Sequence, residues 1–240
     1  MEKIDTWGDT ACDDSTWDDW DVPVHCPVSQ VPSFLPAQDD NAHNPDTSSA
    51  LSHTLEPEPL PLLSWDHLEC GDKIGSGQCG VTHLGMLTLD DGRTTEVVVK
   101  MLHGGSPLTA EARTLQEVAG AGGAPLLHGV ATNPNALVMQ YCPGVTLQAM
   151  LEEYDLQQCY DAYKATVEAV NCFHTAGFYH QDLHPGNIII NTSVLPYTSH
   201  LLDLGYTRRF TGQLVRDDNA KSEDLFCLKQ IKDQIDAKHY

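Results

Sequence analysis

The hydrophobic pattern of this chain changes character near residue 65. Residues 1–64 show no apolar repeat of two or of three to four positions, so we expect a disordered, acidic region there. Beyond it, short β-prone runs come first and longer stretches with helical spacing follow. The predicted strands are Thr82–Leu89, Thr95–Lys100, Leu126–Thr132, Ala136–Gln140 and Ile188–Ile190.

Helical spacing occurs in three places. The stretch Leu108–Ala119 predicts a helix with one apolar stripe, formed by Leu108, Ala112, Leu115 and Val118. A long amphipathic helix is predicted over Leu156–Ala176, and Gly177 would end it. A third helix is predicted to begin near Ser222, whose hydroxyl would cap its first turn.

Composition and charge narrow the possible functions. A length of 240 residues allows one moderate domain plus a tail, and 41% hydrophobic residues are enough for a packed core. The formal net charge of -21 argues against nonspecific binding to nucleic acid or to an anionic membrane, because such binding requires a basic face. The eight cysteines form no CxxC pair, so we expect reduced thiols and an intracellular protein, cytoplasmic rather than nuclear.

The N-terminal region contains one unusual segment, Trp17-Asp18-Asp19-Trp20-Asp21. Acidic residues around aromatic anchors are typical of a short motif that docks into a basic, apolar-lined groove. The segment Trp17–Asp21 is similar to tryptophan-acidic peptides that bind motor-adaptor repeat domains. The alternatives are a charged tether with incidental tryptophans, or a tail that folds back onto its own domain.

A glycine-rich stretch, Ile74–Thr82, places Gly75, Gly77 and Gly80 at GxGxxG spacing. Glycines at this spacing let backbone N–H groups approach nucleotide phosphates. The same pattern marks dinucleotide-binding folds, in which a long helix should follow the glycines. Here the following residues are β-prone and lead into the turn Asp90-Asp91-Gly92, so we predict a β-hairpin instead.

Lys100 ends the predicted strand Thr95–Lys100. A lysine at the end of a buried strand is costly without an acidic partner. The alternative is a lysine that leaves the strand into solvent, which would be the default expectation without the glycine-rich stretch.

The stretch His180–Asn187 predicts a polar loop that leads into a buried strand. Asp182 and Asn187 lie five residues apart with a Pro-Gly turn between them. Such a loop can aim a carboxylate at a substrate hydroxyl and a carboxamide oxygen at a metal ion, as phosphoryl transfer requires. A metal cluster of His180, Asp182 and His184 is disfavoured, because no fourth ligand lies nearby.

These motifs stand in the order found in the protein-kinase-like superfamily, which the chain resembles from Ile74 to Leu228. The last two matching motifs are Asp203-Leu204-Gly205 and Ser222–Leu228. The resemblance implies an α+β, bilobal fold. Its N-lobe would be an antiparallel sheet with one helix, over about residues 65–140, and its C-lobe a shortened, mainly helical unit over about 144–240.

The resemblance also implies catalytic roles. Asp182 would accept the proton of the acceptor hydroxyl. Lys100 would orient the phosphates of ATP while paired with Glu111, for which Glu117 is the alternative. Asn187 and Asp203 would bind Mg²⁺.

The remaining implied positions hold the nucleotide and the loop. His180 and Asp224 would organise the loop backbone. The ATP-binding positions would be Ile74, Gly75, Gly77, Gly80, Thr82, Val98, Lys100, Met139, Gln140 and Cys142.

Several positions depart from the protein kinase pattern. Gln181 replaces the arginine through which a phosphorylated activation loop organises the site, so we predict no activation by that route. His184 stands where serine/threonine kinases carry a lysine near the γ-phosphate. The motif Asp182–Asn187 is also similar to that of small-molecule phosphotransferases. Only 35 residues follow Gly205 (240 minus 205), so we expect no peptide-docking helices.

The sequence therefore favours an ATP-dependent phosphotransferase, above all a Ser/Thr-type protein kinase that transfers the γ-phosphate of Mg-ATP to a hydroxyl. The acceptor would be an unidentified protein or small molecule. One alternative is a nucleotide-binding pseudokinase or decoy that acts through its shortened C-lobe and acidic tail. The second is a small-molecule kinase.

Overall fold

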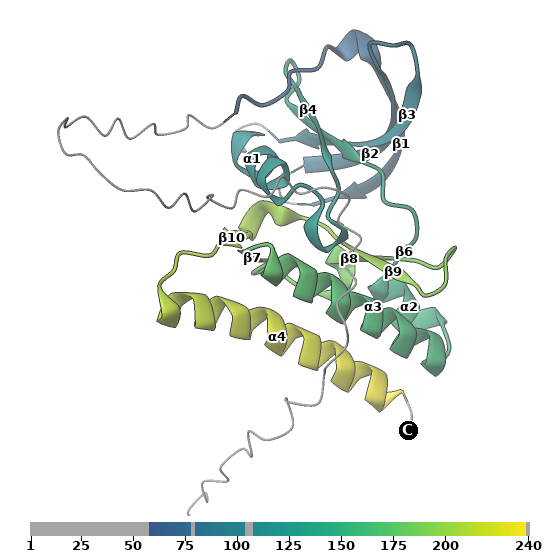
Figure 1. Cartoon of the computed structure of the whole chain (residues 1–240). Helices are drawn as coiled ribbons and strands as arrows, with labels where there is room; N and C mark the ends of the chain where they lie inside the picture. The colour runs from purple at the N-terminus through teal and green to yellow at the C-terminus, as the bar shows by residue number, and fades with distance from the viewer. Residues whose placement is uncertain (1–57, 78–79, 104–107, 239–240) are drawn as a thin grey trace, which may run out of the picture.

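The structure, a computed structural model, describes residues 58–77, 80–103 and 108–238. It is an α+β fold of two lobes, with a β-sheet and one helix above and a mainly helical lobe below (Figure 1). The segment Trp17–Asp21, for which a docking role was predicted, lies outside the described residues.

The upper lobe is a five-stranded antiparallel sheet in the order β1-β2-β3-β5-β4. Its strands are β1 (Leu68–Ser76), β2 (Gly80–Thr88), β3 (Thr94–Leu102), β4 (Leu127–Ala131) and β5 (Ala136–Gln140). The glycine-rich stretch joins β1 to β2, which pair directly. The β-hairpin prediction is therefore confirmed, and the dinucleotide-fold alternative is wrong.

The β-branched run of β3 divides its side chains between two faces of the sheet. Val97 and Val99 are fully buried in a core shared with β2 and β5. Side chains alternate along a strand, so Val98 and Lys100 lie on the opposite face. That face is where the site is assembled.

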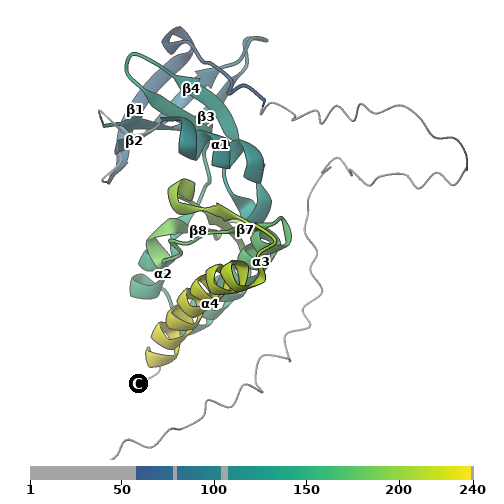
Figure 2. The same ribbon diagram turned by 90° about the vertical axis from the view of Figure 1, so that its left-hand side faces the viewer.

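The helix α1 (Leu108–Val118) lies between the sheet and the lower lobe (Figure 2). Its predicted apolar stripe is buried at Ala112, Leu115 and Val118. The helix packs against β4 and against the short turn Leu204–Tyr206 of the lower lobe. One helix therefore connects a strand-borne lysine in the upper lobe with an aspartate in the lower lobe.

The lower lobe is built on three helices, α2 (Leu147–Glu153), α3 (Leu156–Thr175) and α4 (Leu214–Ala237). Asp155 caps α3 through a capping box with Gln158, in which each side chain bonds the backbone of the other residue. A small sheet is formed by β6 (Val145–Thr146), β8 (Ile188–Asn191) and β9 (Thr198–Leu201), and the polar loop leads into β8, its central strand. The strands β7 (Phe178–Tyr179) and β10 (Arg208–Arg209) form a separate antiparallel pair.

Two helices differ from what the sequence analysis predicted. The helix α4 begins at Leu214, with Gln213 as its N-cap, so Ser222 lies inside it and caps nothing. Its first two turns carry mostly polar residues, which hide the start of the helix from an analysis of apolar spacing. The helix α2 was not predicted, because it is short; Thr146 caps it by accepting from the amide of Ala149.

The thiol prediction holds only in part. Cys70, Cys142, Cys159 and Cys227 are free thiols, whereas Cys172 is disulfide-bonded, contrary to the expectation of reduced cysteines. None of the described helices is long and apolar enough to cross a membrane.

Candidate active site

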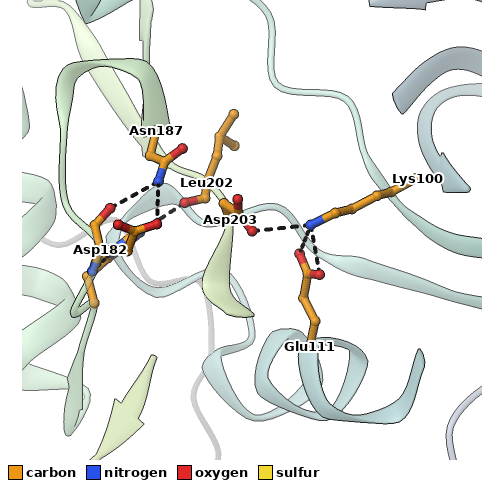
Figure 3. Close-up of polar contacts among 7 residues, drawn as sticks. Lys100, Glu111, Asp182, Asn187, Leu202 and Asp203 are labelled. Carbon is orange, nitrogen blue, oxygen red and sulfur yellow. Dashed lines mark hydrogen bonds and ion pairs between the residues drawn. The ribbon is translucent and has the colours of Figure 1, made fainter. Parts of the chain in front are cut away.

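Lys100 stands at the centre of a group of charges from both lobes (Figure 3). Its Nζ lies 2.9 and 2.8 Å from the two carboxylate oxygens of Glu111 on α1, and 3.2 Å from Oδ1 of Asp203. The Lys100 side chain is only 13% exposed, so the alternative of a lysine in solvent is wrong. Glu117 pairs instead with Arg209, at 3.7 Å.

The acidic partners keep Lys100 charged. Burial alone would lower its pKa, but the ion pairs with Glu111 and Asp203 outweigh burial and hold the pKa above its ordinary value. A lysine held as a cation inside the protein offers a fixed positive charge to an anionic ligand.

The loop His180–Asn187 is attached to α4 through one buried aspartate. Asp224 is 1% exposed and accepts hydrogen bonds from the amides of His180 (2.8 Å) and Gln181 (2.9 Å). Its Oδ2 also lies 2.9 Å from Nε2 of His174. Burial alone would raise the pKa of Asp224, but these hydrogen bonds outweigh burial and hold the pKa below its ordinary value.

His180 connects the loop to the backbone before Asp203. Its side chain is fully buried, its Nε2 lies 2.9 Å from the carbonyl oxygen of Leu202, and its Nδ1 accepts from the amide of Asp182. Burial lowers the pKa of His180 and favours the neutral ring, in which Nε2 donates and Nδ1 accepts. The partner carbonyl of Leu202 was not predicted, because backbone acceptors leave no signal in a sequence.

Asn187 holds Asp182 in place. Its Nδ2 donates to the carbonyl oxygen of Asp182 at 3.0 Å and lies 3.4 Å from the Asp182 carboxylate. The Pro-Gly turn between the two residues is a single 3₁₀ turn, Pro185–Asn187, that returns the chain toward Asp182. Figure 3 shows Asp182 and Asn187 on one side of Asp203 and Lys100 on the other.

Strand register aligns the predicted nucleotide-binding residues of the upper lobe. Gly75 pairs with Thr82, Thr82 with Lys100, and Val98 with Met139, so these residues form neighbouring rows across the sheet. Ile74 lies on β1 and is half exposed.

The remaining two predicted positions lie at the end of β5. The amide of Gln140 donates to the carbonyl oxygen of Leu126, the residue before β4. Cys142 follows in the connection to the lower lobe, where burial raises the pKa of its thiol to about 11.

Gly80 shows why one glycine in this stretch is required by packing. A Cβ at this position would lie 2.2 Å from the carbonyl oxygen of Met101, so only glycine lets β2 approach β3 here. At Gly77 a Cβ would meet nothing within 4 Å, so that glycine is not required by packing.

The side chains present fit Mg²⁺ and a nucleotide. The Nδ2 of Asn187 is engaged by Asp182, which leaves the carboxamide oxygen as its free acceptor, and Asp203 is 48% exposed. Oxygen ligands of this kind suit Mg²⁺, which is commonly held by one or two protein groups together with phosphates and water. Among the described residues, no three His, Cys, Asp or Glu side chains gather as a metal-binding group.

The structure also shows the surroundings of the residues that depart from the kinase pattern. Gln181 has a positive φ of 67°, and its Nε2 donates to the carbonyl of Ala220 on α4. His184 is exposed, and its Nδ1 accepts from the amide of Gly186. Leu204 is buried in the core between the lobes.

A cavity beside the loop was missed by sequence reasoning. Arg208 and Arg209 of β10 and Arg216 of α4 line it, together with Gln181. These arginines are brought together by the pairing of β10 with β7 and by the early start of α4, neither of which was predicted.

The bilobal α+β fold and the lysine–glutamate–aspartate group are those of the protein-kinase-like superfamily. The family model for the protein kinase domain matches residues 68–227, about two thirds of the chain, and the chain belongs to this family. No curated protein matches the chain by sequence.

Proposed function

We propose that this chain is an active Ser/Thr-type protein kinase that transfers the γ-phosphate of Mg-ATP to a protein hydroxyl. The observation that carries the proposal is the Lys100–Glu111 ion pair at 2.8 Å, together with the 3.2 Å contact between Lys100 and Asp203. An intact, buried charge group of this kind is hard to explain without an anionic ligand to receive it.

Each residue contributes a separate task. Bound Mg-ATP supplies the transferable phosphoryl group and the neutralisation of its charge. Lys100, kept in place by Glu111, would hold the phosphates, and Asp203 and Asn187 would hold the metal. The glycine stretch between β1 and β2 would offer its backbone amides to the phosphates.

Asp182 would orient the acceptor hydroxyl and accept its proton. Its backbone is fixed by Asn187 and by His180, so the carboxylate is presented with little freedom. A positioned general base of this kind contributes about 10²–10⁴-fold to rate.

Turnover of Mg-ATP by matched variants tests the proposal. Asp182→Asn should lower phosphotransfer by about 10²-fold or more and leave Mg-ATP binding intact. Asp203→Asn should weaken both binding and transfer. Asp233→Asn, at an exposed position on α4, is the control and should behave as the wild type.

The acceptor panel should contain Ser, Thr and Tyr peptides and small-molecule alcohols. Mg-ATP binding without turnover above that of Asp182→Asn would contradict an active enzyme and support the pseudokinase alternative. Transfer to small molecules alone would favour the small-molecule kinase alternative.

A further inference from the structure

The arginine-lined cavity is a basic feature of an acidic molecule. It has a volume of about 280 Å³ and lies where β7, β10 and the first turns of α4 meet. Arg208, Arg209 and Arg216 line it and are three of the five arginines of a chain with a net charge of -21. A basic site within an overall acidic chain selects for an anionic ligand.

Two of the three guanidinium groups are free to bind such a ligand. All three arginines are exposed. Arg209 lies 3.7 Å from Glu117, whereas neither Arg208 nor Arg216 forms an ion pair with another residue in the described part of the chain. Asp217 and Glu223 also line the cavity.

The carboxylate of Asp217 is already engaged. Its Oδ1 accepts hydrogen bonds from the amide and the hydroxyl of Thr211, each at 3.0 Å. Asp217 therefore shapes the turn that precedes α4. Besides these hydrogen bonds, the charge of Arg216 also helps to lower the pKa of Asp217, but the two side chains form no ion pair.

Exposed apolar side chains belong to the same segment as the cavity. Leu214 and Val215 at the start of α4 are 79% and 77% exposed, and Tyr206 is 60% exposed. Phe210 stacks on Tyr179, which lines the cavity, with ring centroids 4.0 Å apart. The surface is therefore basic at its centre and apolar at its border, and an acidic peptide with aromatic residues would complement both.

The described chain begins close to this surface. The carbonyl of Pro59 accepts from Nε2 of Gln116 on α1, and the neighbouring Glu117 pairs with the cavity residue Arg209. Figure 1 shows α1, β10 and the first turns of α4 on the left side of the molecule. The first described residues therefore contact α1, the helix that also carries the partner of Arg209.

We propose that the segment Trp17–Asp21 of this same chain docks on the arginine-lined cavity. Its carboxylates would pair with Arg208 and Arg216, and its two tryptophans would cover the apolar border. The 36 residues between Asp21 and Glu58 (residues 22–57) can span on the order of 100 Å at about 3.3 Å per residue, far more than docking requires.

The docked segment would lie beside the acceptor. Gln181, which lines the cavity, immediately precedes Asp182. Resting on the proposed function, the segment would therefore restrain transfer to an external acceptor by occupying the space next to the general base.

Arginine side-chain NMR of the full-length chain tests the docking without any activity measurement. The test variant is Asp18→Asn/Asp19→Asn/Asp21→Asn, and the control is Asp39→Asn/Asp40→Asn/Asp46→Asn, which removes the same charge elsewhere in the N-terminal region. The Nε–Hε signals of Arg208 and Arg216 should move in the test variant and stay in place in the control, while that of Arg93 stays in place in both. Unmoved signals of Arg208 and Arg216 in the test variant would overturn the proposal.

Two further measurements sharpen the outcome. The difference between variant and wild type should persist on dilution, because a signal change that disappears on dilution assigns the cavity to a second copy and overturns same-chain docking. Transfer to an external peptide should rise several-fold in the test variant. A moved NMR signal without this rise would retain the docking and remove the restraint.

Discussion

Two aspartates of the lower lobe, Asp224 and Asp203, are placed in opposite ways. Asp224 is 1% exposed and is surrounded by His174 and two backbone amides. Asp203 is 48% exposed, and its only described contact through the side chain is the 3.2 Å ion pair with Lys100. Both carboxylates lie within the same lobe, yet both oxygens of Asp224 accept from protein donors, whereas Asp203 accepts only from Lys100 among the described residues, through one oxygen.

The difference separates the residues that hold the site from those that would act in it. A buried carboxylate whose two oxygens already accept from protein donors is closed to a ligand, and removing it leaves buried donors unpaired. A half-exposed carboxylate contributes little to stability but can bind a cation. Substitutions in the two regions should therefore affect different measurements.

The largest expected effect on stability belongs to Asp224→Asn. The new amide group would face a backbone N–H, and the charge that three donors share would be lost. We expect the free energy of unfolding to fall by about 3 kcal/mol, measured by chemical denaturation. Asp233→Asn on the exposed face of α4 should change it by less than about 0.5 kcal/mol. Equal changes in the free energy of unfolding for the two variants would contradict the structural role of Asp224.

A smaller effect, on kcat/KM for ATP, is expected when the acidic partner of Lys100 is replaced. Glu111→Gln removes the charge that fixes Lys100 and should lower kcat/KM for ATP by about tenfold, the equivalent of one charged hydrogen bond. Glu117→Gln, one residue from Gln116 on the same helix but paired with Arg209, is the control and should stay within about twofold. A larger loss in Glu117→Gln would reverse the assignment of the lysine partner.

The smallest expected effect concerns pH. The folded-state pKa of His180 lies below its unfolded value of 6.5, so between these two values the unfolded chain binds more protons and stability falls as pH decreases. Above pH 6.5 this contribution is fully present. Wild type should lose more thermal stability between pH 7.5 and 5.5 than His180→Gln, by at most about 1.4 kcal/mol per pH unit.

If His180→Gln folds poorly, titration of His180 in the wild-type chain tests the same prediction. The ring signals of His180 in the wild-type chain should remain those of a neutral imidazole at pH 6, where an exposed histidine is mostly charged. An ordinary titration midpoint near 6.5 would contradict the buried, neutral assignment.

The sequence predicted features whose partners are close in chain or fixed by strand pairing. The β-branched run before Lys100 marked a buried strand, and the apolar stripe of the next stretch predicted the helix that carries Glu111. The glycine spacing followed by β-prone residues predicted the first hairpin. In each case the periodicity of the side chains determined the face that they occupy.

Features that depend on long-range packing were not predictable in the same way. The polar first turns of α4 gave no apolar stripe, so the helix was expected to start at Ser222 instead of Leu214. The arginine cavity requires β10 to pair with β7, and two-residue strands carry no periodic signal. The contact of His180 with the Leu202 carbonyl depends on the fold of the whole lower lobe.

The short link between Asp203 and Leu214 has a consequence for regulation. Ten residues join them, and the link is held by the β7–β10 pairing and by the hydrogen bond from Phe210 to Gly177. Control by release of a loop requires a segment with two alternative arrangements, and this link leaves little chain for a second one. Inhibition would instead depend on competition between the segment Trp17–Asp21 and an external substrate for the space beside Asp182. Its strength would then follow the effective concentration of the tethered competitor, so an external substrate would overcome it by mass action.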